Sequence, residues 1–97
     1  MMSLHPDFLR LPIAHRGLHR TGLPENSMAA FRAAIANGYG IECDIQRAMD
    51  GTPMVFHDYE LGRLTHETNG TVAASTPAQL ARLRLLGTDE TIPTLAQ

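Results

Sequence analysis

Two carboxylates two residues apart, Glu42 and Asp44, are the first candidates for chemistry in this sequence. On an extended strand, residues two apart project from the same face, so both side chains would lie together. Adjacent carboxylates repel one another unless a cation lies between them. The oxygen-preferring ions Mg²⁺ and Ca²⁺ are the natural occupants. The alternative is a half-exposed strand whose acids simply face solvent.

Two polar pairs, His15-Arg16 and His57-Asp58, each follow a short apolar run. An arginine at a strand end can hold a phosphate through its planar fork, and a histidine can transfer a proton near neutral pH. Taken singly, either pair could be a solvated surface turn. Together with the two acids they match phosphodiester hydrolysis, in which one histidine protonates the leaving alkoxide and the other deprotonates the attacking hydroxyl.

The elements that must position these residues alternate along the first half of the chain. An apolar run at 11–14 predicts a strand, residues 17–25 a loop, and residues 27–37 a helix that starts at Asn26 or Ser27 and stops at Gly38. The alternation of Ile41, Cys43 and Ile45 with the two acids predicts a strand over 40–45.

A second apolar strand is predicted over 53–56, after the turn dipeptide Asp50-Gly51. So short a connection joins antiparallel strands, because a parallel return needs a crossover of about a dozen residues. The strand that ends at His57 should therefore fold back and bring His57 near the carboxylates.

The second half of the chain has weaker patterns. Residues 59–75 read as irregular, residues 76–87 as a helix with Thr76 and Pro77 at its start, and residues 92–95 as the start of another helix. Strand, helix and strand in this order predict an α/β fold. We expect part of a larger α/β domain, or a chain that completes itself with a partner, because few elements are present to cover a sheet.

Composition restricts the class of protein further. The chain has 97 residues, of which 43% are hydrophobic and 19% charged, and this is typical of one small globular domain. The net charge of −2 argues against a nucleic-acid surface. The single Cys43 fits a reducing compartment, where it would be a buried structural thiol. With no secretory signal or membrane-length apolar stretch in the sequence, we expect a cytoplasmic protein without a transmembrane segment.

The ordered set of motifs from about residue 12 to about residue 95 resembles the N-terminal part of the glycerophosphodiester phosphodiesterase family. No single motif is specific, but their order and spacing together are. The motifs are His15-Arg16-Gly17, Pro24-Glu25-Asn26-Ser27 with Ala30-Phe31, Glu42-Cys43-Asp44-Ile45, Asp50-Gly51, Val55-Phe56-His57-Asp58, Leu61-Gly62-Arg63-Leu64-Thr65 with Gly70, and Ile92-Pro93-Thr94-Leu95.

This resemblance implies the N-terminal portion of a TIM (β/α)8 barrel, with a hairpin-containing insertion after the second strand. Residues 1–97 would form a partial domain, with about 12–45 as the first β-α-β unit and about 46–90 as the insertion. The enzyme would hydrolyse small-molecule glycerophosphodiesters to an alcohol and glycerol 3-phosphate. By motif match, His15 and His57 would be the general acid/base pair, Arg16 would bind phosphate, Glu42 and Asp44 would bind Mg²⁺ or Ca²⁺, and Glu25 would support the site.

The sequence also departs from the family pattern. A third metal-binding glutamate, expected on the following strand, is absent, and Ala48 replaces a usual threonine. We therefore expect little activity from the 97 residues alone, and self-association of an incomplete barrel through its open sheet edges. Two alternatives remain: a lysophospholipase D-like lipid phosphodiesterase, and a non-catalytic metal-binding or oligomerising fragment.

Overall fold

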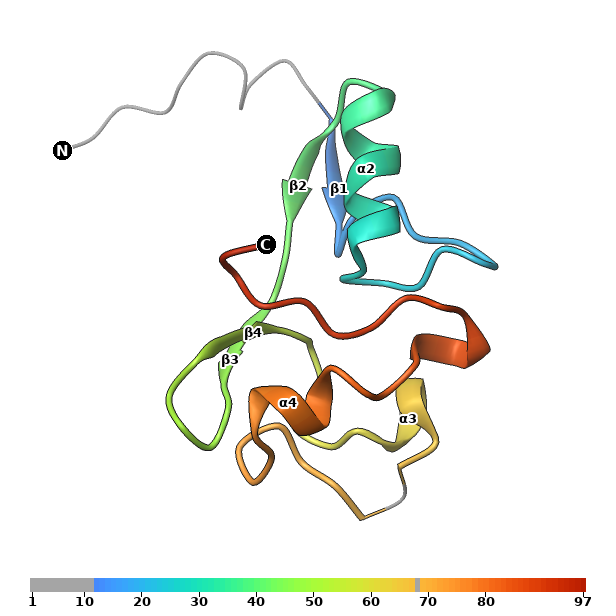
Figure 1. Ribbon diagram of the computed structural model, residues 1–97. Helices are drawn as coiled ribbons and strands as arrows, with labels where there is room; N and C mark the ends of the chain where they lie inside the picture. The colour runs from blue at the N-terminus through green and yellow to red at the C-terminus, as the bar shows by residue number, and fades with distance from the viewer. Residues whose placement is uncertain (1–11, 68) are drawn as a thin grey trace, which may run out of the picture.

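The computed structural model describes residues 12–67 and 69–97. Its strands and helices form two regions, seen at opposite ends of Figure 1. One contains β1 (Ile13–His15), α2 (Met28–Ala36) and β2 (Gly40–Glu42). The other contains the hairpin of β3 (Ile45–Arg47) and β4 (Pro53–Val55), then α3 (Gly62–Thr65), α4 (Pro77–Leu80) and the 3₁₀ turn η1 (Leu85–Gly87). The last residues of the chain run between the two regions.

The first region is a strand-helix-strand unit. β1 and β2 pair in parallel, with Ala14 beside Ile41 and His15 beside Glu42. Paired residues of neighbouring strands share a face, so His15 and Glu42 lie on one face and Ala14 and Ile41 on the other. α2 packs against β2, and Phe31 and Ile41 line a small apolar pocket together with Val55 of β4 and the C-terminal segment 93–95. His15 and Glu42 therefore occupy the face away from the helix.

Helix α2 has the ends that its sequence predicts. Ser27 is the N-cap, and its Oγ accepts a hydrogen bond from the backbone N–H of Ala30 at 3.1 Å. Ser27 is fully buried, and its hydroxyl also donates to the carbonyl of Pro24. Asn37 is the C-cap, and Gly38 follows with φ +76°. Glycine adopts this left-handed conformation without a steric penalty, and this ends the helix.

The predicted antiparallel return is confirmed. β3 and β4 form a hairpin in which Ile45 pairs with Val55, and the backbone N–H of Phe56 donates to the carbonyl of Asp44 at 2.9 Å. The side chain of Asp50 accepts from the backbone of Thr52 in the connecting turn. The backbone segment with His57 and Asp58 therefore follows directly after the residue that pairs with Asp44.

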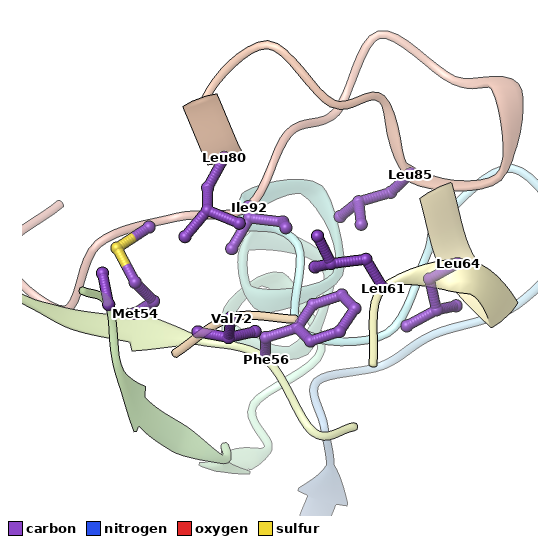
Figure 2. Close-up of a cluster of buried hydrophobic side chains, with 9 residues drawn as sticks. Met54, Phe56, Leu61, Leu64, Val72, Leu80, Leu85 and Ile92 are labelled. Carbon is purple, nitrogen blue, oxygen red and sulfur yellow. The ribbon is translucent and has the colours of Figure 1, made fainter. Parts of the chain in front are cut away.

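Most of the buried apolar side chains lie in the second region (Figure 2). They come from the hairpin, from both short helices and from the segment before the C-terminus, so they join residues far apart in the sequence. Leu83 packs against them, half-buried. The cluster comprises Ala48, Met54, Phe56, Leu61, Leu64, Val72, Leu80, Leu85 and Ile92.

The strand predicted over 40–45 is interrupted. β2 ends at Glu42 and β3 begins at Ile45, so Cys43 and Asp44 lie in the short segment that passes from one sheet to the other. Ile41 and Ile45 are 38% and 50% exposed, so the apolar face predicted for this strand is only partly covered. Of the first predicted strand, Leu11 lies outside the described residues, and Ile13 is 52% exposed.

Three further differences concern the second half. The segment predicted to be irregular contains α3. The helix predicted over 76–87 ends at Leu80, and Leu86 adopts φ +49° in η1, because the chain turns there to pair Arg84 with Thr91. No helix begins at 92–95 in the described chain; this segment lies along β4, where Val55 donates to Pro93 and Leu95 to Pro53.

The start of α4 is as predicted, since Thr76 and Gln79 form a reciprocal capping box and Pro77 stands at the first helical turn. Among residues 12–67 and 69–97, none of the helices has the length and apolar character required to cross a membrane.

Candidate active site

Arg16, in the turn after β1, has an unusual backbone conformation. Arg16 has φ +59° and Asn26 has φ +56°, a left-handed conformation that is uncommon outside glycine. The two backbones are joined, since the N–H of Asn26 donates to the carbonyl of Arg16 at 2.8 Å. Strained residues that neighbouring structure holds in place are common at functional sites.

Gly17 lets this turn lie directly on α2. Its φ is +79°, and a Cβ added there would lie 2.9 Å from the Cβ of Ala30 and 3.0 Å from Cδ1 of Phe31. Any other residue would push the turn away from the helix. Gly17 therefore fixes where His15 and Arg16 leave the strand.

His15 and Glu42 meet at the ends of the parallel strands. Nε2 of His15 lies 3.0 Å from Oε2 of Glu42, and their side chains are 65% and 39% exposed. Both groups are accessible to a ligand in solution.

Asp44 is held by the loop before α2. Its Oδ2 accepts a hydrogen bond from Nδ2 of Asn26 at 3.1 Å and lies 3.5 Å from Nε of Arg16. The sequence pattern indicates Asn26 only as a helix cap, so its contact with Asp44 emerges from the structure alone. The residue type does favour the left-handed backbone conformation of Asn26, because asparagine tolerates it better than most residues do.

Glu25 is the buried carboxylate at the centre of the site. Only 7% exposed, it accepts hydrogen bonds from Nη1 of Arg16 at 3.3 Å and from the guanidinium of Arg63. Burial alone would raise the pKa of Glu25, but Arg63 and then Arg16 outweigh burial and hold it below its usual value. Glu25 thus stays ionised and links the first region to the second.

His57 lies in the second region beside Asp58. Its Nδ1 is 2.7 Å from Oδ1 of Asp58, and Arg63 donates to the other oxygen of Asp58 at 2.8 Å. The hydrogen bond from Arg63, together with His57, lowers the pKa of Asp58 to about 2 despite partial burial. His57 and Asp58 line a surface hollow with Tyr59 and Glu60, and the histidine side chain is 42% exposed.

His57 does not meet the predicted metal carboxylates directly. Among the described residues, one group of three potential metal ligands lies within 4.8 Å, and it consists of Glu25, His57 and Asp58. The guanidinium of Arg63 is bonded to both carboxylates of that group. Its positive charge already neutralises them, which disfavours a cation in the same position.

Glu42 and Asp44 retain free oxygen donors. In the described chain, the side-chain polar contacts of each fall on one carboxylate oxygen, Oε2 of Glu42 and Oδ2 of Asp44. Beside Asp44, Oδ1 of Asn26 is a buried acceptor without a hydrogen-bond partner in the described structure. Carboxylate and amide oxygens are the donors that Mg²⁺ and Ca²⁺ prefer, so these residues fit a hard divalent cation.

Cys43, between the two acids, is unsuited to act as a nucleophile. Its burial and the adjacent charges of Glu42 and Asp44 raise the pKa of its thiol. A thiol with a raised pKa supplies little thiolate. The interpretation as a structural cysteine is consistent with this, although its side chain is half-buried rather than buried.

Comparison with known proteins agrees with the motif resemblance. The glycerophosphoryl diester phosphodiesterase family model matches residues 15–97. Glycerophosphodiester phosphodiesterase 1 of Rattus norvegicus is 42% identical over 93 residues, covering 88% of this chain and 28% of the relative. A glycerophosphodiester phosphodiesterase of Caldanaerobacter subterraneus is 46% identical over 57 residues, covering 58% of this chain and 23% of the relative.

Solved structures share the fold. A phosphodiesterase of Oleispira antarctica, in complex with the product sn-glycerol-3-phosphate, matches with a TM-score of 0.81 and 36% identity over 93% of this chain and 38% of its own. A glycerophosphodiester phosphodiesterase of Agrobacterium tumefaciens matches with a TM-score of 0.78 and 30% identity over 88% of this chain and 39% of its own. The chain thus spans less than two fifths of each of these relatives. Because the family match extends from His15 through every candidate residue of the site, the chain belongs to the glycerophosphoryl diester phosphodiesterase family.

Proposed function

We propose that this chain carries the acid/base and metal-binding part of a glycerophosphodiester phosphodiesterase site. One observation supports the proposal above the others: polar contacts link candidate residues of both regions, while His15 and Glu42 form a separate pair at the ends of the parallel strands. Arg16 contacts Asp44 and Glu25, Glu25 contacts Arg63, and Arg63 contacts Asp58, the partner of His57. The substrate would be a glycerophosphodiester, and the products an alcohol and glycerol 3-phosphate.

His15 and His57 are proposed as the proton-transfer pair. Both are exposed enough to reach a substrate, and each has a carboxylate at one ring nitrogen, Glu42 for His15 and Asp58 for His57. One imidazole would deprotonate the attacking hydroxyl while the other protonates the departing alkoxide oxygen. Such transfers contribute about 10²–10⁴-fold each to a rate.

Arg16 is proposed to hold the phosphate. Its backbone is fixed by Asn26 and its guanidinium by Glu25, so little freedom would be lost when a phosphate oxygen binds. A planar guanidinium matches phosphate geometry better than an ammonium group does. Glu25 supports the site by setting the position of this arginine.

Glu42 and Asp44 are proposed to hold a divalent cation, Mg²⁺ or Ca²⁺. A bound cation would offset the negative charge that develops on the phosphate oxygens. This cluster is preferred over Glu25, His57 and Asp58, because Arg63 already lies on the latter carboxylates.

We further propose that β1, α2 and β2 correspond to the first β-α-β unit of a TIM barrel, and that residues from about 46 to about 90 correspond to an insertion after its second strand. The similarity to family structures and the change of sheet between Glu42 and Ile45 support this. Ile13, Ile35 and Ile41 are exposed apolar side chains of the first region, and self-association through them is proposed. Sedimentation of the chain over a range of concentrations tests it; a monomer throughout would contradict self-association.

Calorimetric titration of the chain with Mg²⁺ and with Ca²⁺ tests the metal site. We expect Glu42→Gln and Asp44→Asn to abolish binding, and the matched control Glu60→Gln, an exposed carboxylate outside both clusters, to leave it unchanged. Binding that instead survives both changes and is lost in Asp58→Asn would assign the cation to the other cluster. Product analysis with water-soluble and lipid diesters separates a glycerophosphodiesterase from a lysophospholipase D-like enzyme, and metal binding without turnover would favour a non-catalytic fragment.

A further inference from the structure

Arg63 makes the densest set of polar contacts near the proposed site, and sequence analysis gave it no role. It lies in the first turn of α3, and its guanidinium donates to two carboxylates at once. Nε donates to Oδ2 of Asp58 at 2.8 Å, and Nη2 to Oδ1 of the same group at 3.1 Å. Nη2 and Nη1 also donate to the two oxygens of Glu25. Asp58 is therefore held in the two-pronged geometry that only an arginine provides.

The carboxylate that Arg63 holds is the one that orients His57. Oδ1 of Asp58 lies 2.7 Å from Nδ1 of His57. An ionised carboxylate can only accept a hydrogen bond, so in neutral His57 the proton lies on Nδ1. Nε2 is then the nitrogen left to accept a proton from a ligand. The position of Asp58 thus decides both the ring orientation and the tautomer.

His57 and Asp58 have few other restraints on their side chains. They are 42% and 26% exposed and lie in a turn after β4. The backbone of this turn is held by Gln46, whose Nε2 lies within hydrogen-bond distance of the carbonyls of Phe56, His57 and Asp58. Gln46 fixes the main chain, but among these contacts only those of Arg63 fix the carboxylate.

Arg63 is in turn anchored to the first region. Glu25 is 7% exposed and also bound by Arg16, so it provides a fixed point outside the turn. The contacts run from Arg16 through Glu25, Arg63 and Asp58 to His57. Through them, the orientation of an imidazole in one region depends on a buried carboxylate of the other.

We propose that Arg63 is a positioning residue for His57, holding Asp58 against Nδ1 so that the imidazole presents Nε2 to a ligand. The structural part of this proposal stands on the contacts alone, and its consequence for turnover rests on the proposed function. Its closest structural control is Glu90, which also joins the two regions by accepting from the backbone N–H of Ala29 at 2.8 Å. Glu90 has no contact with His57 or Asp58 in the described structure.

The test is the tautomer of His57, read from the two ring-nitrogen shifts in a long-range ¹H–¹⁵N spectrum of the ¹⁵N-labelled chain. The spectrum is recorded at alkaline pH, where the ring-nitrogen shifts of His57 no longer change with pH. The signal missing from His57→Gln identifies the residue. In the wild type we expect the Nδ1–H tautomer, whereas a free imidazole favours Nε2–H.

In Arg63→Ala we expect the His57 signal to move towards the tautomer mixture of a free imidazole. In Arg63→Lys we expect only partial recovery of the Nδ1–H tautomer, because an ammonium group cannot bind both oxygens of Asp58 in a fork. Glu90→Ala should retain the wild-type tautomer. The proposal is overturned by an unchanged Nδ1–H tautomer in Arg63→Ala, or by an equal loss in Glu90→Ala, since the latter would show general loosening between the regions.

Turnover supplies an independent second readout. In an active form of the enzyme that contains this chain, Arg63→Ala should lower kcat about 10–100-fold, as removal of groups that orient catalytic side chains does, with KM nearly unchanged. Absence of hydrolysis in every form of the enzyme that contains this chain would contradict the proposed function, while the tautomer result would still decide the role of Arg63. A normal tautomer with normal kcat in Arg63→Ala would reject the positioning role and leave the proposed function intact.

Discussion

The β1–α2–β2 region and the segment from β3 to the C-terminus divide the tasks of this molecule unequally. The first region provides His15, Arg16, Glu42 and Asp44, yet its buried apolar residues are small, Ala14, Ala30 and Ala34. The second contains the hydrophobic core of Figure 2 and contributes His57. Most of the proposed chemistry thus lies on the region with the smaller core, and most of the packing lies beside it.

In the described chain, three polar contacts join the two regions. Glu25 binds Arg63, Glu90 accepts from the first turn of α2, and the backbone of Phe56 bonds to Asp44. Glu25 lies just before α2 and binds Arg63 of α3, and Glu90 lies after η1 and binds Ala29 of α2. We infer that the second region stabilises the first mainly through these polar contacts rather than through shared apolar burial.

The largest contrast between the regions should appear when a large apolar side chain of each region is shortened to alanine. Phe56→Ala removes a ring that is 1% exposed and should lower the free energy of unfolding by about 3–5 kcal/mol. Ile35→Ala in α2, at a position 66% exposed, should change it by less than about 0.5 kcal/mol. Urea unfolding followed by circular dichroism measures both. Similar losses in the two variants would show that the packing is shared between the regions.

A smaller effect is expected at the junction. Glu25→Gln keeps the shape of the side chain but removes the charge that two arginines share, and should cost about 1–3 kcal/mol, as loss of a buried hydrogen-bond acceptor does. Hydrogen exchange should show the increased opening in α2 and α3 together. An increase confined to one of these helices would contradict the role of Glu25 as a link between the regions.

Helix caps give a finer comparison. Ser27→Ala removes a buried cap with two hydrogen bonds, and Thr76→Ala removes one side of a half-buried capping box. Both changes should lie between about 0.5 and 2 kcal/mol, with the Ser27 change the larger. Thermal unfolding of both variants decides the order. A larger loss at Thr76 would mean that the short α4 matters more to the fold than α2.

The smallest effect concerns pH. The pKa of Asp58 is lowered to about 2 in the folded chain, and that of Glu25 is also lowered, so their contributions to stability are complete above the unfolded values of about 4. These contributions disappear as the pH falls towards 2. The free energy of unfolding should therefore decrease from about pH 5 to pH 2, and less steeply in Arg63→Ala. Equal slopes in the two proteins would show that Arg63 does not cause the shifts.

The elements of the first region and the hairpin that follows it were predictable because their signals are local. The cap at Ser27, the stop at Gly38 and the Asp50-Gly51 turn each depend on a few adjacent residues. The short turn also implied the antiparallel hairpin, which brings the backbone of Phe56 beside Asp44, although the side chain of His57 pairs with Asp58 instead. Both the helix ends and the hairpin follow from backbone geometry, and the residue types at the turns indicate that geometry directly.

The second half was harder to predict because its structure depends on distant partners. Leu86 fits a helical spacing with Leu83, yet it is 51% exposed, since the chain turns at η1 so that Leu85 can enter the core. Residues 92–95 pair beside β4 instead of starting a helix. The roles of Asn26 and Arg63 depend on distant partners in the same way, because Asn26 and Asp44 are 18 residues apart in the sequence and Arg63 and Glu25 are 38 apart.

One measurement tests most directly that the two regions build a single site. Residues 15–97 would replace the matched segment of the Oleispira antarctica phosphodiesterase, and release of glycerol 3-phosphate would be followed for His15→Ala, His57→Ala and the double variant. We expect each single change to lower kcat about 10²–10⁴-fold and the double variant to be little slower than the worse single one, because residues that act as a unit are not additive. Full activity in His57→Ala, or losses that multiply independently, would contradict a shared site.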